Sequence, residues 1–149
     1  MAIIEESINI KSPVNKVFSY TLDIKSWPKW FSSITEAEQT AQGQVGIGTT
    51  FTATNKGMGM KVKMTGKVTG YEQNKTWSKD YGARSINTKV RYSFVSFDGG
   101  TKLVQQFDIT ITGFMKLFSS MLVNSIHKQM KIALNNLRVI LILFHSLFS

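Results

Sequence analysis

The chain contains no cysteine among its 149 residues and is poor in several other residue types that support chemistry. Without cysteine it has neither a disulfide framework nor a thiolate, which fits a protein of the reducing cytoplasm. Histidine occurs only at His127 and His145, and neither aspartate nor glutamate follows Asp108. Two histidines without a nearby carboxylate make a poor metal site, and no serine lies in a nucleophile-elbow motif. The sequence therefore predicts no metal, no cofactor and no catalytic residue.

Arginine is scarce in a chain that is strongly basic. The net charge of +9 arises from fifteen lysines and three arginines against nine acidic residues. Arginine is the usual residue for bidentate recognition of phosphates and bases. The lysines are spread along the chain without a nucleic-acid-binding motif, so we favour a solvated basic surface and expect no nucleic-acid partner. An anionic ligand or peripheral contact with a membrane surface is the alternative.

Long apolar runs are also absent. The longest apolar segment, Val139 to Phe148, has about ten residues, whereas a membrane span needs roughly twenty. We therefore expect no transmembrane helix and interpret residues 139–149 as a buried helix end, a homodimer contact or an exposed apolar tail. Met1 to Asn9 contain two glutamates and no basic apolar run, so no secretory signal is expected.

The first forty residues predict one strand and two short helices. Ile3 to Ile10 alternate imperfectly between apolar and polar residues, as a strand does. Ser12 predicts the cap of a helix and Pro13 its first residue. Asp23 predicts the cap of a second short helix, which Pro28 interrupts.

An aromatic segment follows, with three large rings among five residues from Trp27 to Phe31. Two interpretations are open. The segment is either a packed helix corner or an aromatic lip at the entrance of a pocket.

From residue 34 to residue 112 the pattern has a period of two, which is typical of strands. The clearest alternation runs from Met58 to Thr69, where methionine and valine face one way and lysine and threonine the other. Asp98, Gly99 and Gly100 predict a hairpin turn. Consecutive hairpins predict an antiparallel sheet with one apolar face.

A helical pattern replaces the strand pattern at Gly113. Apolar residues recur at helical spacing from Phe114 to Leu137, which predicts a helix roughly 40 Å long. The only surface available to bury its apolar stripe is the sheet, so the fold class is α+β and residues 1–149 form one domain. Large side chains on the facing sides indicate room for a guest between helix and sheet.

Several of these segments together resemble the START-like superfamily, also called SRPBCC or helix-grip, near its polyketide cyclase/dehydrase branch. The resemblance covers about Ile3 to Leu137. It rests on Ser12-Pro13 with Val17-Phe18, Asp23 leading to Trp27-Pro28-Lys29-Trp30, Val45 to Thr49, Gly100-Thr101, and the long final helix. The resemblance implies a curved seven-stranded antiparallel sheet wrapped around the C-terminal helix, with two short helices between the first two strands. It also implies a hydrophobic cavity between sheet and helix.

This resemblance and the inward face together predict a protein that binds or carries a hydrophobic small molecule, such as a lipid, quinone or polyketide. The first alternative is a cyclase/dehydrase that uses the same pocket, with Tyr92, Tyr81 or Lys79 as acid–base groups. The second is an interaction module that uses the apolar tail or the basic sheet face. Trp27, Trp30 and Phe31 would gate the pocket, and Gln105 and Tyr92 would anchor the ligand. The predicted site comprises Trp27, Trp30, Phe31, Met60, Met64, Trp77, Tyr92, Phe94, Gln105, Phe107, Phe118, Met121, Leu122 and Met130.

Overall fold

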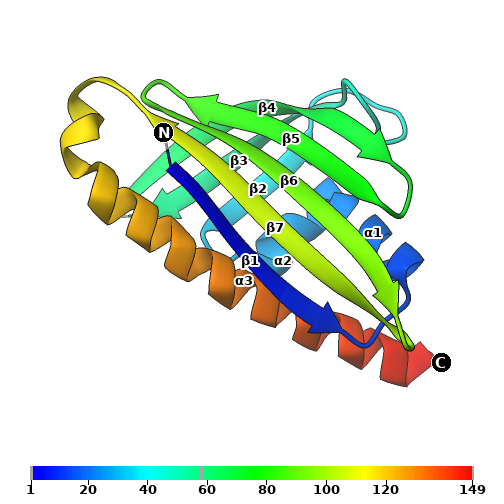
Figure 1. Ribbon diagram of the computed structural model, residues 1–149. Helices are drawn as coiled ribbons and strands as arrows, with labels where there is room; N and C mark the ends of the chain where they lie inside the picture. Colours follow the sequence, from blue (N-terminus) through cyan, green and yellow to red (C-terminus); the bar gives the residue numbers. More distant parts are fainter. Residues whose placement is uncertain (1, 58, 149) are drawn as a thin grey trace.

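The computed structural model describes residues 2–57 and 59–148, with side-chain surroundings up to residue 143. Met58, which the alternation predicts to face inward, and the side chain of His145 lie outside the described residues. Seven strands form one antiparallel sheet in the order β1-β7-β6-β5-β4-β3-β2 (Figure 1). The predicted seven-stranded antiparallel sheet is thus confirmed. The strands are β1 (Ala2–Ile10), β2 (Ile34–Gln39), β3 (Thr50–Gly57), β4 (Met60–Glu72), β5 (Thr76–Ala83), β6 (Ile86–Phe97) and β7 (Gly100–Ile111).

Alternation of side chains gives the sheet one buried and one exposed face. In β6, Val90, Tyr92 and Phe94 are buried, whereas Lys89 and Arg91 are exposed, as the sequence pattern predicts. In β7, every second residue from Leu103 to Ile111 is buried. The inward rows of these two neighbouring strands form the floor of the core.

The turn between β6 and β7 depends on two different properties of glycine. Gly99 has a φ of 72°, a left-handed conformation that glycine adopts without a steric penalty. At Gly100, a Cβ atom would lie 2.7 Å from the carbonyl oxygen of Ile10, so this glycine allows β1 to approach closely. The hairpin predicted here is confirmed, since Phe97 pairs with Gly100.

Three short helical segments connect β1 to β2, and two details differ from prediction. They are α1 (Val14–Leu22), the 3-10 turn η1 (Ile24–Ser26) and α2 (Trp27–Trp30). Pro13, not Ser12, is the N-cap of α1, because the Pro13 carbonyl accepts the first helical hydrogen bond, from Val17 N–H (3.1 Å). The Ser12 carbonyl accepts a hydrogen bond from Thr101 of β7 (2.8 Å). Asp23 caps η1 as expected, through Lys25 N–H (3.2 Å). Pro28 lies in the first turn of α2 and begins that helix rather than interrupting one.

The long helix begins five residues later than the apolar spacing predicts. Residues Gly113–Phe118 form a 3-10 segment, η2, and α3 extends from Ser119 to Phe148. With 30 residues, α3 is about 45 Å long and runs along β1 and beneath the sheet (Figure 1). Met130, Ala133, Leu134, Leu137 and Leu141 form its buried stripe.

The apolar segment that begins at Val139 is a continuation of α3. Leu141 is buried in the core, whereas Val139, Ile142 and Leu143 are exposed, so this segment is in part a buried helix end. Throughout the described part of the chain, every helix is too short or too polar to cross a membrane.

Candidate functional site

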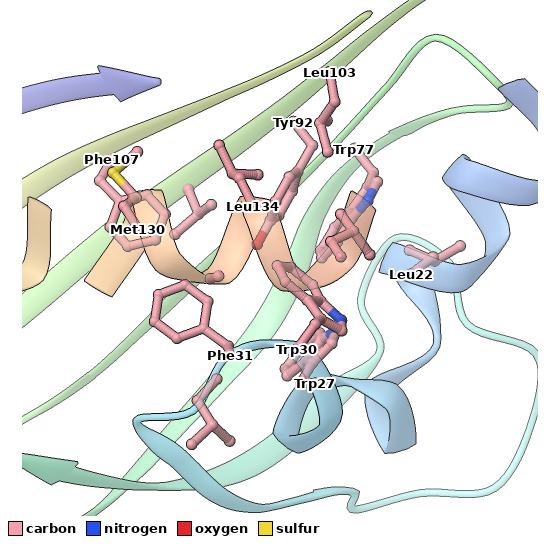
Figure 2. Close-up of a cluster of buried hydrophobic side chains, with 14 of the residues drawn as sticks. Leu22, Trp27, Trp30, Phe31, Trp77, Tyr92, Leu103, Phe107, Met130 and Leu134 are labelled. Atoms are coloured by element: carbon pink, nitrogen blue, oxygen red, sulfur yellow. The ribbon is translucent and has the colours of Figure 1, made fainter. Parts of the chain in front are cut away.

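The interior between α3 and the sheet is filled largely by aromatic rings. Trp27 stacks on Trp77 (6.1 Å between centroids), and Trp77 stacks on Tyr92 (4.4 Å). Phe31 stacks on Phe107 in the same interior (6.2 Å; Figure 2). Such aromatic pairs add about 0.5–1.5 kcal/mol each beyond the area that they bury. Since Trp27, Trp30 and Phe31 are all buried, this segment is a packed helix corner rather than an exposed lip.

Hydrogen bonds fix the orientation of the three indole rings. Trp27 Nε1 donates to the carbonyl oxygen of Thr21 (2.8 Å), and Trp77 Nε1 donates to the Thr21 hydroxyl (3.1 Å). Trp30 Nε1 donates to the hydroxyl of Ser26 (3.2 Å). Sequence reasoning missed Thr21 and Ser26. Each lies on or next to the inward face of a short helix, and a small polar residue near a tryptophan is the only signal that could have indicated them.

A polar group lies within this apolar interior on neighbouring strands. Gln105 of β7 is opposite Tyr92 of β6, and its amide nitrogen donates to the Tyr92 hydroxyl oxygen (3.0 Å). Both side chains are completely buried. Among the described residues, the Gln105 side-chain oxygen has no hydrogen-bond partner. A buried acceptor without a partner is costly, so it is available to a donor group of a bound molecule.

Lys79 of β5 is buried among the same rings, with 5% of its surface exposed. Its ammonium nitrogen lies 3.7 Å from the ring centroid of Trp27 and between 5.3 and 5.7 Å from those of Trp77, Tyr81 and Tyr92. No carboxylate of the described residues lies within 4.0 Å of it. Removal from water lowers the pKa of Lys79 to about 7, so a large fraction of this amine is uncharged at neutral pH.

Burial affects the two inward tyrosines in the opposite direction. It raises the pKa of Tyr81 to about 12, although a hydrogen bond with Thr88 opposes the shift. It also raises the pKa of Tyr92 above its ordinary value, against the effect of the bond from Gln105. Both phenols are therefore neutral at physiological pH and act as hydrogen-bond donors and acceptors, not as bases.

A cavity that is open to solvent lies where the sheet, η2 and the start of α3 meet, and none of the fourteen predicted site residues lines it. Its volume is about 360 Å³, within the range of sites that bind small molecules. Ile109 and Ile111 belong to the same inward row of β7 as Gln105 and Phe107, so the cavity lies at the end of that row. Its lining comprises Ala2, Ile109, Ile111, Lys116, Ser119, Ser120, Val123 and Asn124.

The fourteen predicted site residues fall into three groups. Leu122 is half-buried beside the core, and Met60, Phe118 and Met121 are exposed. The other ten are buried, and eight of those pack into one cluster. The buried residues are Trp27, Trp30, Phe31, Met64, Trp77, Tyr92, Phe94, Gln105, Phe107 and Met130.

The three exposed residues have separate physical reasons for their positions. Met60 has the inward parity of Met64, but it is the first residue of β4, next to the hairpin, and is 64% exposed. Met121 lies nine residues before Met130, about two and a half turns of helix, which places the two on opposite faces of α3. Phe118 belongs to η2, whose 3-10 geometry breaks the helical spacing that the prediction assumed.

In the structure His127 has a carboxylate partner, Glu6, which is far from it in the sequence and was therefore not predicted. His127 Nε2 donates to Glu6 of β1 (2.8 Å), and the ammonium of Lys131 lies 3.6 Å from the same oxygen. These contacts join α3 to β1. Within the described residues, no three histidine or acidic side chains are grouped as metal ligands.

Comparison with known proteins identifies the family. The model of the family described as "Polyketide cyclase / dehydrase and lipid transport" matches residues 1–141, and the chain belongs to this family. No curated protein matches it. The fold is START-like: a START superfamily protein from Mycobacterium smegmatis superposes with a TM-score of 0.74, at 14% identity over 89% of this chain and 93% of that one.

Two further solved structures share the whole arrangement. A protein from Thermus thermophilus has a TM-score of 0.82 and 14% identity, covering 99% of this chain and 100% of its own. The aromatase/cyclase Zhui from Streptomyces has a TM-score of 0.78 and 12% identity, covering 91% of this chain and 90% of its own. At these identities the likeness concerns the fold.

Proposed function

We propose that this protein binds and carries a hydrophobic small molecule, which enters through the cavity between β7 and α3. The observation that carries the proposal is this cavity of about 360 Å³, whose wall continues into the apolar inward face of the sheet. Membership of a family of cyclases and lipid carriers supports the same interpretation.

The ligand is expected to be mostly apolar with a polar group at one end. Ile109, Ile111 and Val123 provide the apolar wall of the cavity. Gln105 lies on the same inward row of β7 as Ile109 and Ile111, and its unpartnered oxygen would offer an acceptor to a ligand that extends along this row into the packed core. The buried Lys79 amine of β5 would offer a donor. Pockets that are largely apolar with a few polar anchors recognise small molecules in this way.

Blocking the cavity tests the proposal. An NBD-labelled fatty acid is titrated against the protein, and its dissociation constant is read from NBD fluorescence. Val123→Trp adds a large ring to the cavity wall, and we expect it to weaken binding about tenfold or more, since it removes most of the space available to the ligand. Val95→Trp, at an exposed position of β6, is the matched control and should bind as the wild type does. Equal affinity of both variants, or no binding by the wild type, would contradict the proposal.

A second candidate function is a cyclase/dehydrase, and the position of Lys79 favours it. An amine with a pKa of about 7 can accept and donate protons at neutral pH, as general acid–base catalysis requires. The Tyr81 ring centroid lies 5.3 Å from this nitrogen and could orient a carbonyl beside it. Turnover of a linear poly-β-ketone thioester that survives Lys79→Met and Tyr81→Phe unchanged would exclude this candidate.

A further inference from the structure

An exposed apolar surface lies on η2 and the first turn of α3. Phe114, Leu117, Phe118 and Met121 form it, and we call these four residues the apolar ridge. Their exposed fractions are 74%, 77%, 38% and 55%. Leu117 follows Phe114 by one turn of 3-10 helix, and Met121 follows Phe118 by three residues at the start of α3. Phe114 and Phe118 contact each other edge to face, with 5.8 Å between their ring centroids.

The ridge is distinct from the stripe that holds α3 on the sheet. Met115 and Val123 pack against the core, and Met130 is buried within it. These contacts fix the orientation of η2 and thereby direct the ridge outward. Soluble proteins rarely expose a cluster of four large apolar side chains unless the cluster contacts another partner.

Charge indicates which kind of partner fits the ridge. Lys116 lies between Met115 and Leu117 and is exposed, and exposed Lys128 follows Met121 by about two turns of α3, whereas Lys131 is paired with Glu6. No acidic residue follows Asp108. An apolar surface next to such lysines suits an anionic lipid interface, where the apolar side chains enter the headgroup region and the ammonium groups meet lipid phosphates. A second copy of the chain is the other occupant, and measurement of the solution mass below distinguishes it from a lipid surface.

We propose that the apolar ridge and Lys116 dock this protein on the surface of an anionic bilayer. Figure 1 shows η2 and the start of α3 at one end of the molecule, opposite the C terminus. The cavity of the proposed function is lined by Lys116, Ser119 and Ser120, so it lies at this same end of the molecule. Docking itself requires no ligand, and its test is independent of ligand binding.

Vesicle flotation with no ligand added tests the docking. Vesicles of phosphatidylcholine with about 30% phosphatidylglycerol provide the anionic surface, and pure phosphatidylcholine vesicles provide the comparison. We expect Phe114→Ser with Leu117→Ser to lower partitioning about tenfold or more, since two inserted side chains are lost. The matched control is Ile47→Ser with Val95→Ser, two apolar residues that are 71% and 59% exposed elsewhere. This control should partition as the wild type does.

Two further measurements distinguish docking from other behaviour. Lys116→Gln should weaken binding to anionic vesicles in dilute salt and have little effect at about 0.5 M salt, where the attraction is screened. The three native tryptophans are buried, so Phe114→Trp provides the only exposed indole among the described residues, and dibrominated lipid should quench it. The proposal is overturned if the ridge and control variants partition equally or if the indole at position 114 is not quenched. It is also overturned if solution mass shows a ridge-dependent dimer without vesicle binding.

Discussion

Replacing Lys79 with methionine removes a buried charge while keeping a flexible side chain of similar length. Lowering a pKa from 10.5 to about 7 corresponds to about 5 kcal/mol of folding free energy, at about 1.4 kcal/mol for each tenfold change in ionisation. Contact with the face of Trp27, 3.7 Å from the ammonium, favours the protonated amine and so acts against this cost. We therefore expect Lys79→Met to stabilise the folded protein by up to about 5 kcal/mol at pH 6.

The dependence on pH follows from the direction of the shift. Below about pH 7 the amine is protonated in both the folded and the unfolded protein, so the full cost of burying the charge is present. Between pH 7 and 10.5 the unfolded chain binds more protons than the folded one, so the stability of the wild type rises with pH. The advantage of Lys79→Met should therefore shrink across this interval and nearly vanish above it.

Urea unfolding followed by tryptophan fluorescence at pH 6, 8 and 10 measures this difference. A change in the urea concentration at the unfolding midpoint, with an unchanged dependence of the unfolding free energy on urea, shows that only stability has changed. Lys89→Met, on the exposed face of neighbouring β6, is the control and should change stability by less than about 0.5 kcal/mol at each pH. A Lys79→Met protein that is no more stable than the wild type at pH 6 would refute the reasoning, as would a gain that is independent of pH.

Three other substitutions test the packing around the site by the same urea assay. Gly66→Ala should destabilise by about 2 kcal/mol or more, because a Cβ would lie 2.5 Å from the Tyr81 Cβ; wild-type stability would contradict this close approach. Met130→Ala should cost about 2–5 kcal/mol through the space it leaves, whereas exposed Ile132→Ala should cost little; equal effects would disprove the burial. Thr21→Val should cost about 1–3 kcal/mol by leaving the Trp77 indole N–H unpaired, and Thr21→Ser should restore most of it.

The strands were predictable because their alternation is a local property. Each inward residue of β7 from Leu103 to Ile111 follows from a period of two, and the hairpin turn at Gly99 confirms the antiparallel direction. The same alternation placed Gln105 and Tyr92 on one face, and the structure joins them by a hydrogen bond.

Features that depend on contacts between distant segments were not predictable. Ser12 has the residue type of a helix cap, but its carbonyl pairs with Thr101, which lies far along the chain. Met60 is exposed because it is the first residue of β4, at the edge of the hairpin. The alternation of apolar and polar residues does not indicate where a strand begins. Likewise, Lys79 has inward parity, but the absence of any nearby carboxylate among the described residues emerges only when β5 and α2 are packed together.

The pairing of β1 with β7 has a consequence for how the chain folds. Ala2 lies opposite Ile109, so the partners are separated by about a hundred residues of chain. Among the described strands, β1 is at the edge of the sheet and pairs with β7 alone. During synthesis, strands β2 to β6 can form successive hairpins before β7, the partner of β1, has been made. Helix α3 is synthesised after β7 and packs against β1 later still. Closing such long loops makes folding slow compared with a helical protein of the same size. The first strand to be synthesised is thus the last to be paired.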